Sequence, residues 1–106
     1  MTLSIRAACV VLLAASIAGP AFSQAAGGDT YKAKCAMCHG ADGLAATPMA
    51  KTMKVLSFKA SEMVKATDAQ FIASTTNGKG KMPAYKGKLT DAQIKDVVSY
   101  IRTLQK

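Results

Sequence analysis

The chain has 106 residues and is strongly basic, with 14 lysine and arginine residues against 6 aspartate and glutamate residues and a formal charge of +8. This length allows one small domain with a limited core. The basic residues are not interleaved with aromatic ones, as they are on nucleic-acid-binding surfaces, so we expect no nucleic-acid partner.

Residues 1–23 have the features of a cleaved secretory signal peptide. Arg6 precedes 12 apolar residues, "AACVVLLAASIA" (7–18), and a glycine, a proline and small residues follow them. The apolar run is shorter than the roughly 20 residues of a membrane-spanning helix, so we expect no stable membrane insertion after cleavage; an uncleaved anchor is the alternative. We predict cleavage after Ser23, or two residues later, export to the periplasm and a mature domain of residues 24–106.

The mature domain keeps 13 basic and all 6 acidic residues, a formal charge of +7, and two of the three cysteines. It has no tryptophan, and its aromatic residues are Tyr31, Phe58, Phe71, Tyr85 and Tyr100. A domain this small buries little apolar surface unaided and usually needs a staple or a cofactor. We therefore expect a bound group to supply a large apolar body to the core.

The first predicted element of the mature domain is a short helix from about residue 28 to residue 37. The preceding "QAAGG" (24–28) is predicted to be a flexible lead-in. Gly27, Tyr31 and Cys35 are spaced four apart, so a helix would place all three on one face.

The middle of the chain is predicted to consist of loops and short helices. The stretch "HGADGLAATPM" (39–49) holds two glycines and a proline, which favours an irregular loop. Residues 50–65 are predicted as short helical pieces and turns. Thr67 and Gln70 then form a capping box, which predicts a helix over 68–76 that ends at the glycine-rich "NGKG".

The last helix has the strongest sequence signal. "KMPAYKGKL" before it is extended or turning, because a proline disfavours helix at the preceding residue. Thr90 and Gln93 form a second capping box, and Leu89 and Ile94 are spaced as a hydrophobic staple. The apolar residues at helical spacing are Ile94, Val97, Val98, Ile101 and Leu104. No segment alternates as a strand does, so the predicted fold class is all-α.

The segment "KCAMCHG" (34–40) places Cys35, Cys38 and the only histidine, His39, within five positions. Structural zinc usually takes four cysteine or histidine ligands, and the mature chain has three. A thioredoxin-like redox pair requires a βαβ context, which an all-α chain lacks. A disulfide would close so short a loop that it would remove little chain entropy.

The spacing C-x-x-C-H is the attachment signal of a c-type haem. Each thiol adds across one vinyl group, which gives two thioether bonds, and the adjacent imidazole is placed to bind the iron. One covalently attached haem c accounts for Cys35, Cys38 and His39 and for the missing apolar body. A chance disulfide beside a surface histidine is the alternative.

The second axial ligand decides the function, because iron held by His39 alone would be open to oxygen or peroxide. Methionine is the usual partner in electron-transfer cytochromes and raises the reduction potential. Met37 lies inside the attachment motif and cannot reach the opposite haem face. Met82 lies in a glycine- and proline-rich loop that can cross this face. The methionines that are equally well explained as core residues are Met49, Met53 and Met63. We predict His39 and Met82 as the metal ligands.

Three segments together resemble a known family. "CAMCHG", "NGKGKMPAY" and "LTDAQIKDVVSYIRTL" occur in an order and spacing that make residues 27–106 similar to a class I cytochrome c of the short bacterial type, like cytochromes c6, c551 and c553. The resemblance implies an α-helical fold around one haem, with crossing first and last helices. Gly27 or Gly28, with Tyr31, matches the first-helix side of the crossing, and Tyr100 matches the last-helix side.

The resemblance also implies further cofactor-binding residues. Pro48 matches the proline whose carbonyl accepts the second N–H of the ligating histidine, a bond of the kind that orients metal-bound imidazoles. Thr47 stands before it, where glycine is common in the family. Tyr85, in the "NGKGKMPAY" segment, is expected at the haem. Many relatives carry a tryptophan that this chain lacks, so the resemblance assigns no partners to the haem propionates.

With both axial positions filled, no substrate can coordinate, so the predicted function is a soluble single-electron carrier and not an enzyme. Lysines beside Met82 and before Cys35 would form a basic rim that attracts acidic surfaces of redox partners in weak, transient complexes. The lysines of this rim are Lys32, Lys34, Lys79, Lys81, Lys86 and Lys88. A monomer is expected. The alternatives are a five-coordinate haem protein that binds gas or peroxide, and a small subunit of a larger oxidoreductase.

Overall fold

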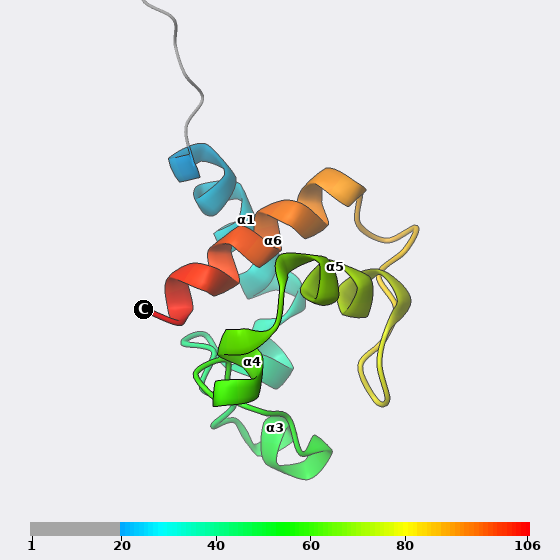
Figure 1. Ribbon diagram of the computed structural model, residues 1–106. Helices are drawn as coiled ribbons and strands as arrows, with labels where there is room; N and C mark the ends of the chain where they lie inside the picture. The colour runs from blue at the N-terminus through cyan, green and yellow to red at the C-terminus, as the bar shows by residue number, and fades with distance from the viewer. Residues whose placement is uncertain (1–19) are drawn as a thin grey trace, which may run out of the picture.

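A computed structural model describes residues 20–106, with side chains from residue 24 onward. The helices are α1 (Pro20–Lys34), α2 (Ala36–His39), α3 (Pro48–Met53), α4 (Ser61–Lys65), α5 (Asp68–Asn77) and α6 (Asp91–Leu104), as Figure 1 shows. Only isolated bridges and no sheet form in this part of the chain, which confirms the all-α prediction. None of the helices described is long and apolar enough to cross a membrane. Most of the predicted signal peptide lies outside the described residues.

The first and last helices cross, with α1 passing behind α6 in the view of Figure 1. They approach so closely that a Cβ atom on Gly27 would lie 2.1 Å from the carbonyl oxygen of Asp96. Gly28 lies against the ring of Tyr100, and the fully buried Tyr31 packs on the same ring with centroids 5.2 Å apart. The crossing and the residues implied for it are confirmed.

The prediction of a flexible lead-in over 24–28 is wrong, because α1 already begins at Pro20. Proline is tolerated in the first turn of a helix, where its missing N–H would have no partner. The two glycines that suggested flexibility instead allow the close approach to α6. The first helix also ends at Lys34, before the predicted residue 37, and the attachment segment forms the separate short helix α2.

Both predicted capping boxes are formed. At the start of α6, the amide of Gln93 donates to the Thr90 hydroxyl (3.1 Å) and the amide of Thr90 donates to the Gln93 side chain (2.8 Å). Thr67 and Gln70 make the same pair of bonds before α5. Four residues of the apolar stripe of α6 are buried, as their spacing predicted, on a helix that packs against α1 and α5: Ile94, Val97, Val98 and Ile101. Leu104 is half-buried.

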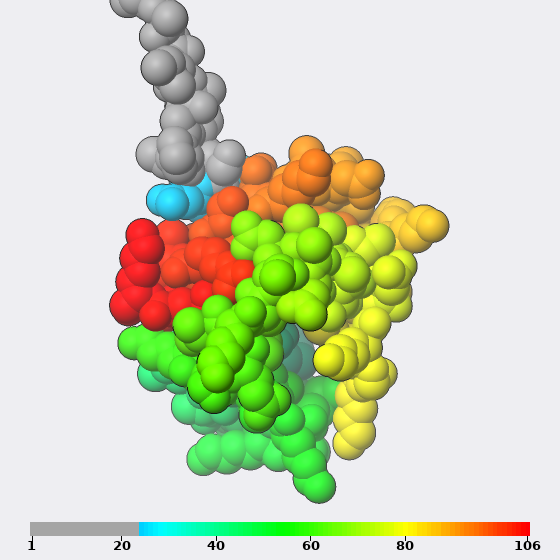
Figure 2. Space-filling view, viewed as in Figure 1, coloured from blue at the N-terminus to red at the C-terminus, as the bar shows by residue number. Residues whose placement is uncertain are grey.

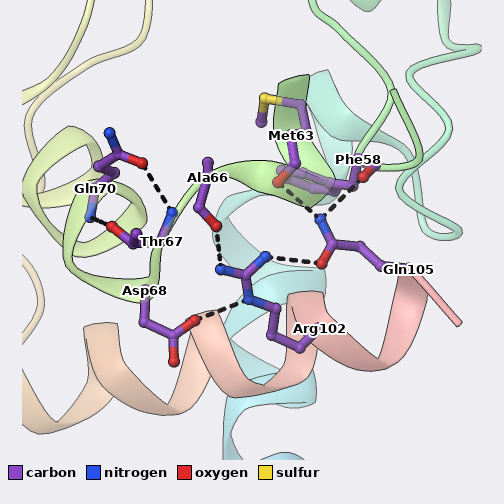
Figure 3. Close-up of polar contacts among 8 residues, drawn as sticks. All are labelled: Phe58, Met63, Ala66, Thr67, Asp68, Gln70, Arg102 and Gln105. Carbon is purple, nitrogen blue, oxygen red and sulfur yellow. Dashed lines mark hydrogen bonds and ion pairs between the residues drawn. The ribbon is translucent and has the colours of Figure 1, made fainter. Parts of the chain in front are cut away.

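The end of α6 is hydrogen-bonded to the segment that precedes α5 (Figure 3). The Arg102 guanidinium donates to the carbonyl of Ala66 (2.6 Å) and to the side-chain oxygen of Gln105 (2.9 Å). The Gln105 amide donates to the carbonyls of Phe58 (2.9 Å) and Met63 (3.3 Å). These bonds fix the irregular chain between α3 and α5, which forms one side of the site described next.

Candidate haem site

A cavity of about 1010 Å³ opens between α2, the segment 53–58, α4, α5 and the loop 79–85. Figure 2 shows a hollow between the green segment around residue 60 and the yellow loop around residue 80. Phe58, Phe71 and Val97 line its inner end, which connects it to the core. A cavity of this size and partly apolar lining suits a large flat cofactor.

All three residues of the attachment motif line this cavity. Cys35 precedes α2 and accepts the amide of His39 at its carbonyl (3.0 Å), so the short helix carries the motif as one unit. Both thiols, of Cys35 and Cys38, are free and half-buried. Burial, and secondly the neighbouring Cys38, raises the pKa of Cys35 to about 11, so its thiol is uncharged at neutral pH.

The imidazole of His39 is held against an aromatic ring. It stacks on Phe58 with the centroids 4.7 Å apart and the planes inclined by 15°. Its Nδ1 is buried and has no hydrogen-bond partner among the residues described. Burial lowers the pKa of His39, which favours the neutral imidazole, the form that binds a metal.

The imidazole of His39 makes no hydrogen bond to Pro48. Pro48 is the first residue of α3, it is not among the residues that line the cavity, and its carbonyl accepts the hydroxyl of Thr52 (3.1 Å). The hydrogen bond expected between this carbonyl and the imidazole is not formed, since Nδ1 of His39 has no hydrogen-bond partner among the described residues.

Thr47 has a role that the sequence analysis missed. Its hydroxyl donates to the carbonyl of Met37 (3.1 Å) in α2 and accepts the amide of Ala50 (3.0 Å) in α3. The residue that departs from the glycine of the family thus links the attachment helix to α3. A threonine directly before a proline is a common start of a helix, and this pattern was the available signal.

The cavity separates the methionines into two groups. Met37 and Met49 lie outside it, with 74% and 42% of their surfaces exposed. Met53, Met63 and Met82 line it. Met63 also packs against the core.

Met82 is presented by a tight turn. Lys79 and Met82 exchange two main-chain hydrogen bonds, of 3.0 and 3.1 Å, and Gly80 between them has a φ of +57°, which glycine adopts readily. Tyr85 lines the same cavity, and its hydroxyl donates to the carbonyl of Lys34 (3.0 Å). Two of the residues predicted at the cofactor are thus held on the loop that faces the attachment helix.

The charged side chains around the cavity are mostly cationic. One acidic residue, Glu62, lines it, against five lysines. These are Lys34, Lys54, Lys65, Lys79 and Lys81. Of the lysines of the predicted basic rim, Lys34, Lys79 and Lys81 line the cavity, whereas Lys32, Lys86 and Lys88 do not, and the lining adds two lysines that the sequence analysis did not name.

A family model described as "Cytochrome C oxidase, cbb3-type, subunit III" matches residues 22–101. The cytochrome c6 of Leptolyngbya boryana is 44% identical over 77 residues, which cover 73% of this chain and 87% of that protein. The chain belongs to the class I c-type cytochromes. The cytochrome c6 of Synechococcus sp. (strain ATCC 27167 / PCC 6312) is 34% identical to this cytochrome over 102 residues, 93% of this chain and 88% of that one.

A solved structure, "KustC0563 c-type cytochrome", has a TM-score of 0.69 to this cytochrome with 29% identity, and the match covers 76% of this chain and 98% of that one. The predicted family, fold class, cofactor and general function are confirmed: the cytochrome is an electron carrier, not an enzyme, and it binds one covalently attached haem c. The cavity fits this group, because it combines apolar walls with two thiols and a neutral imidazole.

Proposed function

We propose that this cytochrome carries single electrons between redox partners outside the cytoplasm, with its haem attached to Cys35 and Cys38 and the iron bound by His39 and Met82. The observation that supports this most directly is the shared cavity. Side chains from α2 and from the turn before Pro83, far apart in the sequence, line one space of suitable size.

The bound haem supplies the one-electron chemistry of its iron, and the chain tunes and protects it. The neutral imidazole of His39 and the thioether of Met82 would leave no open position for a substrate. A thioether is a soft, neutral ligand, which favours the reduced state. Apolar walls such as Phe58 and Phe71 act in the same direction, because they disfavour the additional positive charge of the oxidised state.

The ligation is tested by the variant Met82→Ala with Met53→Ala as matched control, since both side chains line the cavity. We expect the oxidised wild type to show the charge-transfer band of methionine-bound iron, and its reduced form to be indifferent to carbon monoxide. Met82→Ala should lose the band and bind carbon monoxide, whereas Met53→Ala should behave as the wild type. Rapid carbon monoxide binding by the wild type would instead support the five-coordinate alternative.

The lysines around the cavity support docking to acidic patches in weak, transient complexes. Electrostatic attraction of this kind raises association rates and weakens as salt screens it. We expect Lys81→Glu to slow electron transfer to an acidic partner at low salt, with the difference from wild type vanishing at high salt. Lys95→Glu on α6, which does not line the cavity, is the control with the same charge change.

Export and cleavage are further parts of the proposal. The proposed cut after Ser23 leaves a mature domain of 24–106 and would fall within α1, which begins at Pro20. Mass spectrometry of the periplasmic fraction should detect a chain that begins at Gln24 and carries one haem. Sedimentation of this material tests the proposed monomer. A mass that includes residues 1–23 would contradict the cleavage.

The description of the matching family model favours a second candidate, a subunit of an oxidase. Against this, the match to the cytochrome c6 of Leptolyngbya boryana covers 87% of that protein, which supports the independent carrier. Fractionation of native cells separates the two. A carrier is recovered without membranes, whereas a subunit purifies in stoichiometric amounts with a membrane-bound oxidase.

A further inference from the structure

Phe58 is in face-to-face contact with the imidazole of His39. The two rings are 4.7 Å apart and inclined by only 15°, and Phe58 is 3% exposed. We propose that Phe58 is a positioning residue that fixes the plane of the His39 ring at the iron. The inference rests on the proposed ligation by His39 and extends it to a residue outside the attachment motif.

A ligating imidazole is ordinarily oriented by a hydrogen bond from its second nitrogen. In this cytochrome Nδ1 of His39 is buried without a partner among the described residues. Rotation about the Cβ–Cγ bond (χ2) sets the plane of the imidazole. This torsion has broad minima, so the side chain alone does not fix the orientation of the ring. A flat ring stacked on one face opposes this rotation, because turning the imidazole would drive its edge into Phe58.

Phe58 can fix the orientation of the imidazole only if its own ring is held in place. Its amide donates to the carbonyl of Gly43 (2.9 Å), and its carbonyl accepts the side-chain amide of Gln105 (2.9 Å). Its ring meets the ring of Phe71 nearly edge-on (6.1 Å, 79°) and lies 6.4 Å from Tyr31. A Cβ on Gly43 would come within 2.9 Å of the Phe58 ring, so this glycine is required for the contact. Residues that precede and follow Phe58 in the sequence therefore hold it in place from several sides.

Proton NMR of the oxidised holoprotein tests the inference, because the paramagnetic shifts of the haem methyl groups depend on the orientation of the axial imidazole plane. Phe58→Leu keeps an apolar side chain but removes the flat stacking surface. We expect a changed pattern of methyl shifts while the absorption spectrum still shows both axial ligands. Tyr100→Leu is the control, since it removes a half-buried aromatic that packs against the core and does not line the cavity; it should lower stability and leave the methyl pattern unchanged.

Gln105→Glu is a second variant in case Phe58→Leu does not fold. A carboxylate can still accept from Arg102 but cannot donate to the Phe58 carbonyl. We expect a smaller change of the methyl pattern in the same direction. If the variants that fold keep the wild-type pattern, the inference is wrong although the proposed ligation stands. A wild-type spectrum without histidine-bound low-spin iron would overturn both.

Discussion

The hydroxyl of Tyr85 donates a hydrogen bond to the main-chain carbonyl of Lys34, 3.0 Å away, and so joins two parts of the chain separated by 51 positions. Lys34 is the last residue of α1 and directly precedes the attachment motif. Tyr85 belongs to the loop that carries Met82, and its amide donates to the carbonyl of Thr75 in α5 (3.0 Å). The bond thus connects two segments that line the cavity.

Tyr85→Phe should loosen the loop that carries Met82. A hydrogen bond of this kind contributes about 1 kcal/mol, which corresponds to roughly a fivefold change in an equilibrium. We expect added imidazole to replace Met82 in the oxidised variant with roughly fivefold higher affinity than in the wild type, as measured by absorption titration. Met53→Ala serves for comparison, since its side chain lines the cavity outside this loop. An unchanged affinity would show that the bond does not restrain the ligand.

Gly27→Ala should strongly destabilise the protein, whereas the adjacent Gly28→Ala should not. The new Cβ at Gly27 would meet the backbone carbonyl of Asp96 at 2.1 Å, which neither helix can avoid without separating. At Gly28 it meets only the ring of Tyr100, at 3.0 Å, and a side chain can turn aside. We expect a loss of about 3 kcal/mol for the first variant. The second should stay within about 1 kcal/mol of the wild type, because alanine also favours the helix. Denaturant titrations of both holoproteins measure the difference, and equal losses would contradict this account of the crossing.

The stability of the protein should decrease as the pH rises above 10 because of Tyr31. This side chain is fully buried and donates to the carbonyl of Gly40 (2.6 Å), and burial raises the pKa of Tyr31 above its ordinary value of 10. The unfolded chain loses the phenol proton above pH 10 while the folded chain keeps it. The unfolded state is therefore stabilised relative to the folded state as the pH rises.

Tyr31→Phe removes this group at a cost of about 1–2 kcal/mol at neutral pH, because the Gly40 carbonyl loses its bond. The free energies of unfolding of wild type and variant should therefore converge at alkaline pH. A constant difference across this range would mean that Tyr31 does not carry the pH dependence.

The contacts of Arg102 should contribute very different amounts to the free energy of unfolding. Its ion pair with Asp68 spans 2.8 Å, but the carboxylate side chain is 69% exposed, so Asp68→Asn should cost at most about 0.5 kcal/mol. Arg102→Met also loses the bond to the Ala66 carbonyl and the contact of the guanidinium with the Phe71 ring, 4.5 Å from its centroid. We expect a loss of about 2 kcal/mol in urea denaturation. A similar loss for both variants would assign the stabilisation to the ion pair.

Local patterns predicted those parts of the fold in which the interacting residues are close in sequence. Thr67 with Gln70 and Thr90 with Gln93 satisfy helix-start amides three positions away, so the starts of α5 and α6 were predicted correctly. The attachment motif was equally visible, because its three residues are nearly contiguous. Gly27 was placed correctly at the crossing only through the family resemblance.

The errors and omissions involve contacts between distant segments. Glycine in "QAAGG" suggests flexibility unless one knows that α6 lies against it, so the start of α1 was predicted too late. The stacking of Phe58 on His39 depends on Gly43 and Gln105 as well, and no local pattern relates these positions. The bond expected between Pro48 and the imidazole is likewise absent, and Nδ1 of His39 has no hydrogen-bond partner among the described residues.

The close contact of Gly27 with the main chain of Asp96 also has a consequence for biosynthesis. Because α1 is translated before α6, the glycine face of α1 has no partner until α6 has been made. The nascent polypeptide cannot complete the helix crossing before α6 emerges from the ribosome. The chain therefore stays incompletely folded until that point, which is the state that the proposed export through a translocation channel requires.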